Sequence, residues 1–413
     1  MKFQIASPSH YFTDLRLPWS RHLNDWPEEH FVEVARGIHR NVVKFISHKD
    51  QVYALKELST PIAQKEYRLL RELQELGLPV VEPVGLVTNR DENVSDSRYL
   101  PISKPRTVDL HKRGLLITNY MVGALPYRNI VQQGISPEQM HQMLDALAEL
   151  LVRLHLSGFY WGDCSFSNAL FKRDAGLMAA YLVDAETGEL LDELTDRRRE
   201  YDLELAHTNI AGDLMDIEAS VGLPGQLDPV DLADSLMDRY NNLWAELTRF
   251  EIFNPEDQFL IEKRISRLND LGFDVEEMEI TTVDDGKQVR MVPRVVEHWH
   301  HKRRLASLTG FQVQENQARR LLNSLNRYRI TLSEQEGRDV PLPVAAYRWI
   351  SEIFNPSVQN IPKELKGGLD DAEIFHEILE HRWYLSEATH ADVGMAFAST
   401  SYVDTILRIR KQK

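Results

Sequence analysis

An acidic residue, an amide residue and a second acidic residue follow one another at short spacing near the middle of the chain, and they constrain the fold more than any other feature. Asp163 precedes Asn168 by five residues, and a later apolar run of strand type ends on Asp184. A carboxylate can receive a proton from a hydroxyl group, and carboxylate and amide oxygens are ligands that suit Mg²⁺. Phosphoryl transfer from a nucleotide needs both kinds of group in one cleft. Asp and Asn are also common in turns, so the spacing needs support from elsewhere in the chain.

That support begins in the segment Gln51–Leu58, where apolar and polar residues alternate as in a strand. Ala54 and Lys56 share one face of this predicted strand, because side chains alternate between its faces. The small Ala54 leaves room for a flat nucleotide base, and Lys56 can reach phosphate oxygens from the same face. A single lysine on a strand is more often a plain surface residue, so the functional interpretation needs a partner for Lys56.

A helix from Pro61 to about Leu76 supplies that partner. Thr60 is the expected N-cap, and Gly77 is expected to end the helix. Glu66 falls inside the apolar stripe, where a carboxylate is costly unless it is paired, although an exposed position at the margin of the stripe is the alternative. Lys56 lies ten residues upstream, and we expect a Lys56–Glu66 ion pair. The apolar positions of the stripe are Ile62, Leu69, Leu73 and Leu76.

These segments resemble two atypical branches of the protein-kinase-like fold, the RIO kinases and the lipopolysaccharide (Kdo-type) kinases. Lys65–Pro79 resembles their helix-to-strand segment, and Leu115–Met121 is similar to their hinge strand. Gly158–Asp163 resembles the approach to their catalytic loop, and Tyr181–Asp184 resembles the end of their metal-binding strand. The resemblance extends over roughly residues 30 to 205, and the order of the segments is more specific than any one of them.

The resemblance implies an α+β fold with two kinase-like lobes, a small antiparallel-sheet lobe and a helical lobe. It also implies that ATP and Mg²⁺ are the cofactors. Asp163 would be the catalytic base, Asn168 and Asp184 the metal ligands, and Lys56 with Glu66 the pair that orients the ammonium group towards the phosphates. The acceptor would be a molecule with a hydroxyl group.

Two further groups of residues are candidates for nucleotide binding. Asn119 and Met121 lie where the resemblance puts the hinge, whose backbone groups usually hold the adenine. Arg36–Asn41 lies where a glycine-rich phosphate loop is expected, but it contains one glycine. Gly37 can still turn the backbone there and Arg40 can hold phosphate; a plain hairpin turn is the favoured interpretation.

Other departures from the kinase pattern argue against a conventional protein Ser/Thr kinase. Trp161 stands where a histidine is usual, and Ala185-Glu186 stands where Phe-Gly is usual. There is no Ala-Pro-Glu segment and no obvious long activation loop. Three functions stay open: a kinase acting on a small molecule, glycan or protein; a pseudokinase that binds nucleotide as a regulator; and an interaction scaffold without catalysis.

The sequence as a whole predicts two domains. Residues 1–250 form the kinase-like domain, with the small lobe at about 20–120 and the helical lobe at about 121–250. Residues 251–413 form a mostly helical α+β domain, which resembles a C-terminal bacterial domain of unknown function and would recruit a protein partner or shape the acceptor site. Helices are expected at 137–157, 197–217, 229–250, 256–271, 296–308, 314–328, 344–353, 371–385 and 403–410, and strands at 277–282 and 288–292.

Composition excludes several classes of protein and site. The net charge of −15 makes nucleic-acid binding an unfavoured function, and the single cysteine, Cys164, fits a reducing cytoplasm. The N-terminus lacks the apolar region of a signal peptide, and no apolar run is long enough for a transmembrane segment. His376 and His381 miss the metalloprotease spacing by one residue, so ordinary helix positions are favoured. The basic run after Glu297–His301 is expected to be a solvated helix face.

Overall fold

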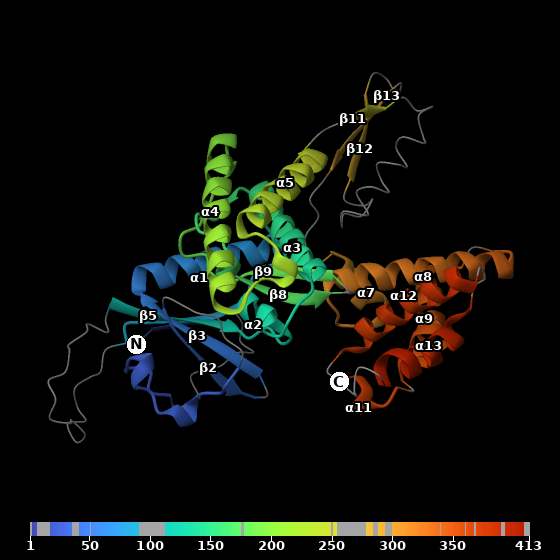
Figure 1. Ribbon diagram of the computed structural model, residues 1–413, viewed down its shortest axis with the longest axis horizontal. Helices are drawn as coiled ribbons and strands as arrows, with labels where there is room; N and C mark the ends of the chain where they lie inside the picture. The colour runs from blue at the N-terminus through green and yellow to red at the C-terminus, as the bar shows by residue number, and fades with distance from the viewer. Residues whose placement is uncertain are drawn as a thin grey trace. The chain divides into compact units, whose positions relative to one another are not determined.

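The computed structural model describes residues 2–5, 17–34, 41–49, 51–90, 112–174, 177–248, 251–253, 278–283, 288–293, 300–338, 340–359, 361–366, 369–389 and 393–408 (Figure 1). Contacts divide the chain into two compact units. The first comprises residues 1–172 and 179–295, and the second comprises residues 173–178 and 296–413. The domain boundary expected at residue 250 stays a prediction.

An antiparallel sheet of five strands forms the small lobe of the first unit. Its order is β1-β4-β5-β3-β2, and helix α1 (Thr60–Glu75) contacts β3, β4 and β5 (Figure 1). The strands are β1 (Lys2–Ile5), β2 (Val42–His48), β3 (Gln51–Ser59), β4 (Pro83–Thr88) and β5 (Arg113–Asn119). The alternation predicted for β3 is confirmed, because Tyr53 and Leu55 are buried while Ala54 and Lys56 are partly exposed.

The N-terminal segment 17–31 packs its aromatic and apolar side chains on the buried face of this sheet. Trp19, Leu23 and Trp26 form one hydrophobic cluster with residues of β2 to β5. A fully buried arginine, Arg90, forms an ion pair with Glu57 of β3 on the same face. Because these side chains cover one face of β3, Lys56 lies on the opposite, partly exposed face.

Helix α1 has the length predicted from the sequence, but its cap and part of its buried stripe differ from the prediction. Ser59 occupies the N-cap position and Thr60 is the first helical residue, so the expected Thr60 cap is wrong. Gly77 follows the helix with a φ of 73°, a conformation that favours glycine, as predicted. Ile62 and Leu76 of the expected stripe are exposed, whereas its other members are buried together with Ala63, Tyr67 and Leu70. The buried residues of α1 are Ala63, Glu66, Tyr67, Leu69, Leu70 and Leu73.

The helical lobe follows β5 in the same unit. Its helices are α2 (Tyr127–Gln132), α3 (Pro137–Leu156), α4 (Asp196–Val221) and α5 (Pro229–Thr248). Its strands are β6 (Ala124–Pro126), β7 (Phe159–Tyr160), β8 (Ala169–Asp174), β9 (Leu177–Leu182) and β10 (Glu189–Leu190). A capping box begins α3, since Ser136 and Gln139 exchange side chain–backbone hydrogen bonds.

A three-stranded sheet, β11-β13-β12, follows α5. Its strands are β11 (Glu251–Phe253), β12 (Met278–Val283) and β13 (Gln288–Pro293). The two strands expected at 277–282 and 288–292 are confirmed, and Val283 pairs with Gln288 at the end of the hairpin. The sheet contacts α5 and groups with the first unit. The helix expected at 256–271 lies outside the described residues.

The described part of the second unit is helical around an aromatic core that contains Trp349, Phe354 and Phe375. Its helices are α7 (His300–Thr309), α8 (Glu315–Glu336), α9 (Leu342–Trp349), α10 (Asn355–Val358), α11 (Lys363–Lys366), α12 (Asp371–Thr389) and α13 (Met395–Tyr402). Helix α13 was not predicted, and the helix expected at 403–410 is a π-helical turn, Val403–Leu407. The tip of the β8–β9 hairpin belongs to this unit: the Asp174 carboxylate accepts a hydrogen bond of 2.7 Å from the backbone N–H of Gln317 near the start of α8.

The predicted fold class is confirmed: an antiparallel-sheet lobe is followed by a helical lobe and then by a mostly helical region. None of the helices in the described ranges has the length and apolar character that crossing a membrane requires.

Candidate functional site

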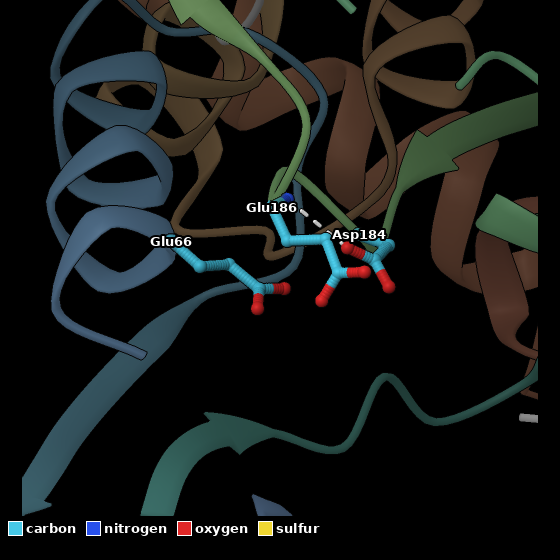
Figure 2. A group of neighbouring side chains, drawn as sticks. All are labelled: Glu66, Asp184 and Glu186. Carbon is cyan, nitrogen blue, oxygen red and sulfur yellow. Dashed lines mark hydrogen bonds between the residues drawn. The ribbon is translucent and has the colours of Figure 1, made fainter. Parts of the chain in front are cut away.

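The ammonium group of Lys56 lies at the centre of a cluster of carboxylates. Its Nζ is 3.0 Å from Oε1 of Glu66, 2.6 Å from Oδ2 of Asp184 and 3.8 Å from Oε2 of Glu186. Figure 2 shows the three carboxylates converging from α1 and from the segment after β9. The predicted Lys56–Glu66 pair is therefore present, and it brings Asp184 into the same group.

Burial and the neighbouring charges shift the pKa values of Glu66 and Lys56. Glu66 is fully buried, and burial raises its pKa to about 7 against the opposing attraction of Lys56. Burial by itself lowers the pKa of Lys56, but attraction by Glu66 and Asp184 outweighs it and raises the pKa above its ordinary value. The ammonium group is thus held in its charged form, as a residue that contacts phosphate requires.

Backbone contacts fix the chain after helix α1 to β9, the strand that ends two residues before Asp184. The chain after α1 pairs in parallel with β9: the N–H of Leu182 donates to the carbonyl of Pro79, and the N–H of Val81 donates to the carbonyl of Leu182, each at 2.9 Å. In addition, Nζ of Lys65 donates to the backbone carbonyl of Glu186 at 2.9 Å. These contacts set the distance between Glu66 and Asp184.

The loop between β7 and β8 carries the proposed base. The side-chain amide of Asn168 donates to Oδ2 of Asp163 at 3.0 Å, and that of Asn209 donates to Oδ1 at 3.0 Å. The backbone carbonyl of Asn168 accepts a hydrogen bond from Val183, beside Asp184. Asn168 therefore contacts Asp163 through its side chain and the residue before Asp184 through its backbone, so the three residues of the sequence pattern lie in one connected region.

Trp161, which departs from the expected histidine, has a structural partner of its own. Its indole Nε1–H donates to the backbone carbonyl of Asp184 at 3.1 Å, and the ring is fully buried. The backbone N–H groups of Trp161 and Gly162 both donate to the carboxylate of Asp202, at 2.7 and 2.8 Å. Trp161 thus connects the loop to the segment after β9 that carries Asp184.

Three polar residues on α4 hold this loop, and sequence reasoning missed all of them. Asp202 binds the start of the loop, Asn209 binds Asp163, and Asp213 accepts hydrogen bonds of 2.9 Å from the N–H and the hydroxyl of Ser167. Their spacing of seven and then four residues puts them on one face of a helix. That spacing within the predicted helix 197–217 was the available signal, since it interrupts an apolar stripe with polar residues.

The fully buried His155 adds a pH dependence to this network. Its Nε2 lies 3.1 Å from Asp202, and its Nδ1 lies 2.7 Å from the hydroxyl of Tyr240. Burial lowers the pKa of His155, although Asp202 opposes this. Because the unfolded chain takes up a proton near pH 6.5 and the folded protein does so at lower pH, we expect the free energy of unfolding to fall as the pH drops below about 6.5, by no more than about 1.4 kcal/mol per pH unit.

The measurement is urea unfolding from pH 5 to pH 7.5 with the wild type and with His155→Gln. The variant keeps an amide in place of the imidazole but cannot titrate, so the difference in unfolding free energy between the two proteins should shrink as the pH falls. A difference that is constant across the range would show that His155 does not titrate on unfolding.

The residues predicted to bind nucleotide differ in whether the structure leaves their groups available. Ala54 lies beside Lys56 on the same face of β3. The N–H of Asn119 donates to the carbonyl of Glu82 and the N–H of Tyr120 donates to that of Val52, so neither is available for a base. Among the hydrogen bonds of the described residues none uses the N–H of Met121. Gly37 and Arg40 lie outside the described residues.

The remaining sequence candidates have ordinary surroundings. Cys164 is a fully buried core residue, and its burial raises the pKa of its thiol. His376 pairs with Glu380 and His381 contacts the hydroxyl of Ser401, which confirms them as helix residues with separate partners.

The donor set around Asp184 fits a divalent cation. Glu66, Asp184 and Glu186 offer carboxylate oxygens that all lie within 4.8 Å of one another, and oxygen donors suit Mg²⁺. Glu66 is already engaged by Lys56 at two oxygens, 3.0 and 3.1 Å away. Lys56 contacts Asp184 through Oδ2 alone, so Asp184 and Glu186 are the residues that would hold the ion.

Comparisons with known proteins agree with the sequence resemblance. Residues 32–217 match the model of the lipopolysaccharide kinase (Kdo/WaaP) family, and residues 242–407 match that of a domain of unknown function (DUF4032). No curated protein matches the chain significantly. A solved structure, WaaP in complex with acyl carrier protein, is similar over 66% of this chain and 99% of its own, at 14% identity and a TM-score of 0.37. The expected resemblance is confirmed: residues 32–217 carry the pattern of the lipopolysaccharide kinase (Kdo/WaaP) family, which is protein-kinase-like, and residues 242–407 carry that of the domain of unknown function.

Proposed function

We propose that this protein is a phosphotransferase that uses ATP and Mg²⁺ and acts on a hydroxyl group of a small molecule, glycan or protein. The observation that carries the proposal is the position of Lys56, whose ammonium group contacts both Glu66 of α1 and Asp184 after β9. Kinase-type phosphoryl transfer needs a lysine oriented in this way, beside the carboxylate that holds the metal. The match of residues 32–217 to a kinase family supports the same chemistry.

Each residue of the site has one role in the proposal. Lys56 binds the α- and β-phosphates, and Ala54 leaves space for the base above them. Asp163 accepts the proton of the acceptor hydroxyl, since each of its oxygens keeps a free lone pair beside its amide donor. Asn168 and Asp184 hold Mg²⁺, with Glu186 as an additional ligand. When bound, the ion neutralises charge on the phosphates.

The segment after Asp184 favours an acceptor other than a bound peptide strand. Only eleven residues separate Asp184 from the start of α4 at Asp196, and Glu189–Leu190 of this segment pair with β7. A protein kinase uses a longer loop here to support its substrate. We propose a small molecule or glycan as the first acceptor class to test, and the cytoplasm, where ATP is abundant, as the compartment.

The alternative function is a pseudokinase that binds nucleotide without transfer. It is compatible with the same Lys56–Asp184 contact and with the missing Phe-Gly pair. Incubation of the protein with γ-labelled ATP, Mg²⁺ and a cell extract distinguishes the two. Label on an acceptor supports the enzyme, and nucleotide binding without transfer to any acceptor supports the regulator.

Asp184→Ala should abolish the Mg²⁺-dependent part of nucleotide binding. ATP at 100 times its dissociation constant stabilises a protein by about 2.7 kcal/mol. We expect the wild type to show this stabilisation with Mg²⁺ and to lose most of it without the ion, whereas the variant should give the same small shift in both conditions. The measurement is thermal unfolding with and without ATP and Mg²⁺.

Asp192→Ala is the matched control, because Asp192 is an exposed carboxylate in the segment that follows Asp184. It should respond to Mg²⁺ as the wild type does. If Asp184→Ala keeps the full Mg²⁺ response, Asp184 is not a metal ligand and the proposed site is wrong.

A further inference from the structure

The side chain of Asn209 on α4 contacts the proposed base directly, although Asn209 belongs to none of the motifs that carry the kinase-like resemblance. Its Nδ2 donates to Oδ1 of Asp163 at 3.0 Å and to the backbone carbonyl of Cys164 at 3.3 Å. Asn168 donates to the other oxygen of the same carboxylate. Both oxygens of Asp163 are therefore held by amide donors from opposite sides of the loop.

Two amide donors restrict the carboxylate more than one does. With Asn168 alone, the Asp163 side chain can rotate about its terminal bond, because χ2 of aspartate has a broad energy profile. A second donor at the other oxygen fixes this rotation and so fixes the direction of the remaining lone pairs. Proton transfer needs the accepting oxygen within hydrogen-bond distance of the acceptor hydroxyl, and a misplacement of 1 Å can be costly.

The loop backbone has other supports that do not involve Asn209. Asp202 holds the N–H groups of Trp161 and Gly162, and Asp213 holds the N–H and hydroxyl of Ser167. Each end of the loop is thus attached to α4 by a carboxylate. Removal of the Asn209 amide is expected to free the Asp163 carboxylate while the path of the chain persists.

We propose that Asn209 is a positioning residue that orients the Asp163 carboxylate towards the acceptor hydroxyl. It acts through Asp163 and contacts neither nucleotide nor metal, so it affects the transfer step and leaves nucleotide binding unchanged. This inference rests on the proposed phosphotransferase function for its catalytic meaning.

The test compares Asn209→Ala and Asn209→Asp with the wild type in steady-state phosphate transfer. Asn209→Asp has nearly the same shape, but it replaces the amide donor with a carboxylate that repels Asp163, so the orienting contact is lost while the packing is kept. For both variants we expect kcat to fall by about 10- to 100-fold, the range of a misplaced group. We expect KM for ATP and the thermal shift with ATP and Mg²⁺ to remain within about twofold of the wild type. The side-chain partners of Asn209 are Asp163 and Cys164, and neither is a proposed nucleotide-binding residue.

Thr208→Ala is the matched control. Thr208 is the preceding residue on α4, it is exposed, and its hydroxyl donates to the carbonyl of Glu204 within the helix. This variant should keep the wild-type kcat. A kcat of Asn209→Ala equal to that of the wild type overturns the proposal, as does a wild-type kcat in Asn209→Asp or a loss of kcat that is matched by an equal rise in KM.

A second measurement tests the orientation without relying on catalysis. Crystal structures of the wild type and of Asn209→Ala should show the Asp163 carboxylate rotated or in several orientations in the variant. An identical single orientation in both overturns the inference. If the wild type transfers no phosphate, the proposed function fails while this comparison still decides whether Asn209 orients Asp163.

Discussion

Replacement of Asp163 with asparagine is expected to reduce phosphate transfer by about 10²- to 10⁴-fold, the range contributed by a positioned general base. The amide has nearly the shape of the carboxylate, but it cannot accept the proton of the acceptor hydroxyl. Lys56, Asp184 and Glu186 are unchanged, so nucleotide and Mg²⁺ binding should persist. The predicted signature is therefore a loss in kcat with a retained thermal shift on addition of ATP and Mg²⁺.

The measurement is initial rates of phosphate transfer from labelled ATP, with Asp192→Asn as the control. Asp192 is an exposed aspartate of the same lobe, so the same chemical change there should leave the rate at the wild-type level. Retention of transfer by Asp163→Asn would show that another group receives the proton. Loss of nucleotide binding in this variant would show instead that Asp163 serves the nucleotide.

Replacement of Arg90 with alanine is expected to lower the free energy of unfolding by about 3–5 kcal/mol, because it leaves the Glu57 carboxylate buried without its counter-charge. Arg90 is fully buried and its guanidinium group donates to Glu57 and to the backbone carbonyls of Trp19 and Arg21. Burial lowers the pKa of Arg90, while Glu57 opposes the shift. The same group also ties the N-terminal segment to β3, so its loss should expose the cluster around Trp19.

Urea unfolding followed by tryptophan fluorescence measures this effect. Arg71→Ala is the control: Arg71 forms an exposed pair with Glu75 on α1, and such pairs contribute about 0–1 kcal/mol. Replacement of both members of the buried pair by apolar residues, Arg90→Met with Glu57→Leu, should recover part of the loss, since no charge is left unpaired. A loss from Arg90→Ala no larger than that of the control would contradict the prediction.

Much of the local structure could be predicted from the sequence, for physical reasons that act over short distances. Alternation identified β3, apolar periodicity identified α1 and α3, and a costly buried carboxylate identified the pairing of Glu66 with Lys56. Each of these features depends on residues in the same helix or strand, or in two that follow each other in the chain. Two errors remain: α1 begins one residue earlier than predicted, and Ile62 is exposed because the sheet covers a different part of the helix surface.

The sequence by itself determined the strand with Lys56, the helix with Glu66 and the order of the acidic and amide residues, because periodicity and capping act within single segments. Only the tertiary structure decided which polar groups meet: Asp202, Asn209 and Asp213 of α4 on the loop of Asp163, and Arg90 on Glu57. A buried polar group must find a partner, but that partner can come from any segment that the fold brings within hydrogen-bond distance. Spacing along α4 indicates that its polar residues share a face, but it does not identify the segment that they contact.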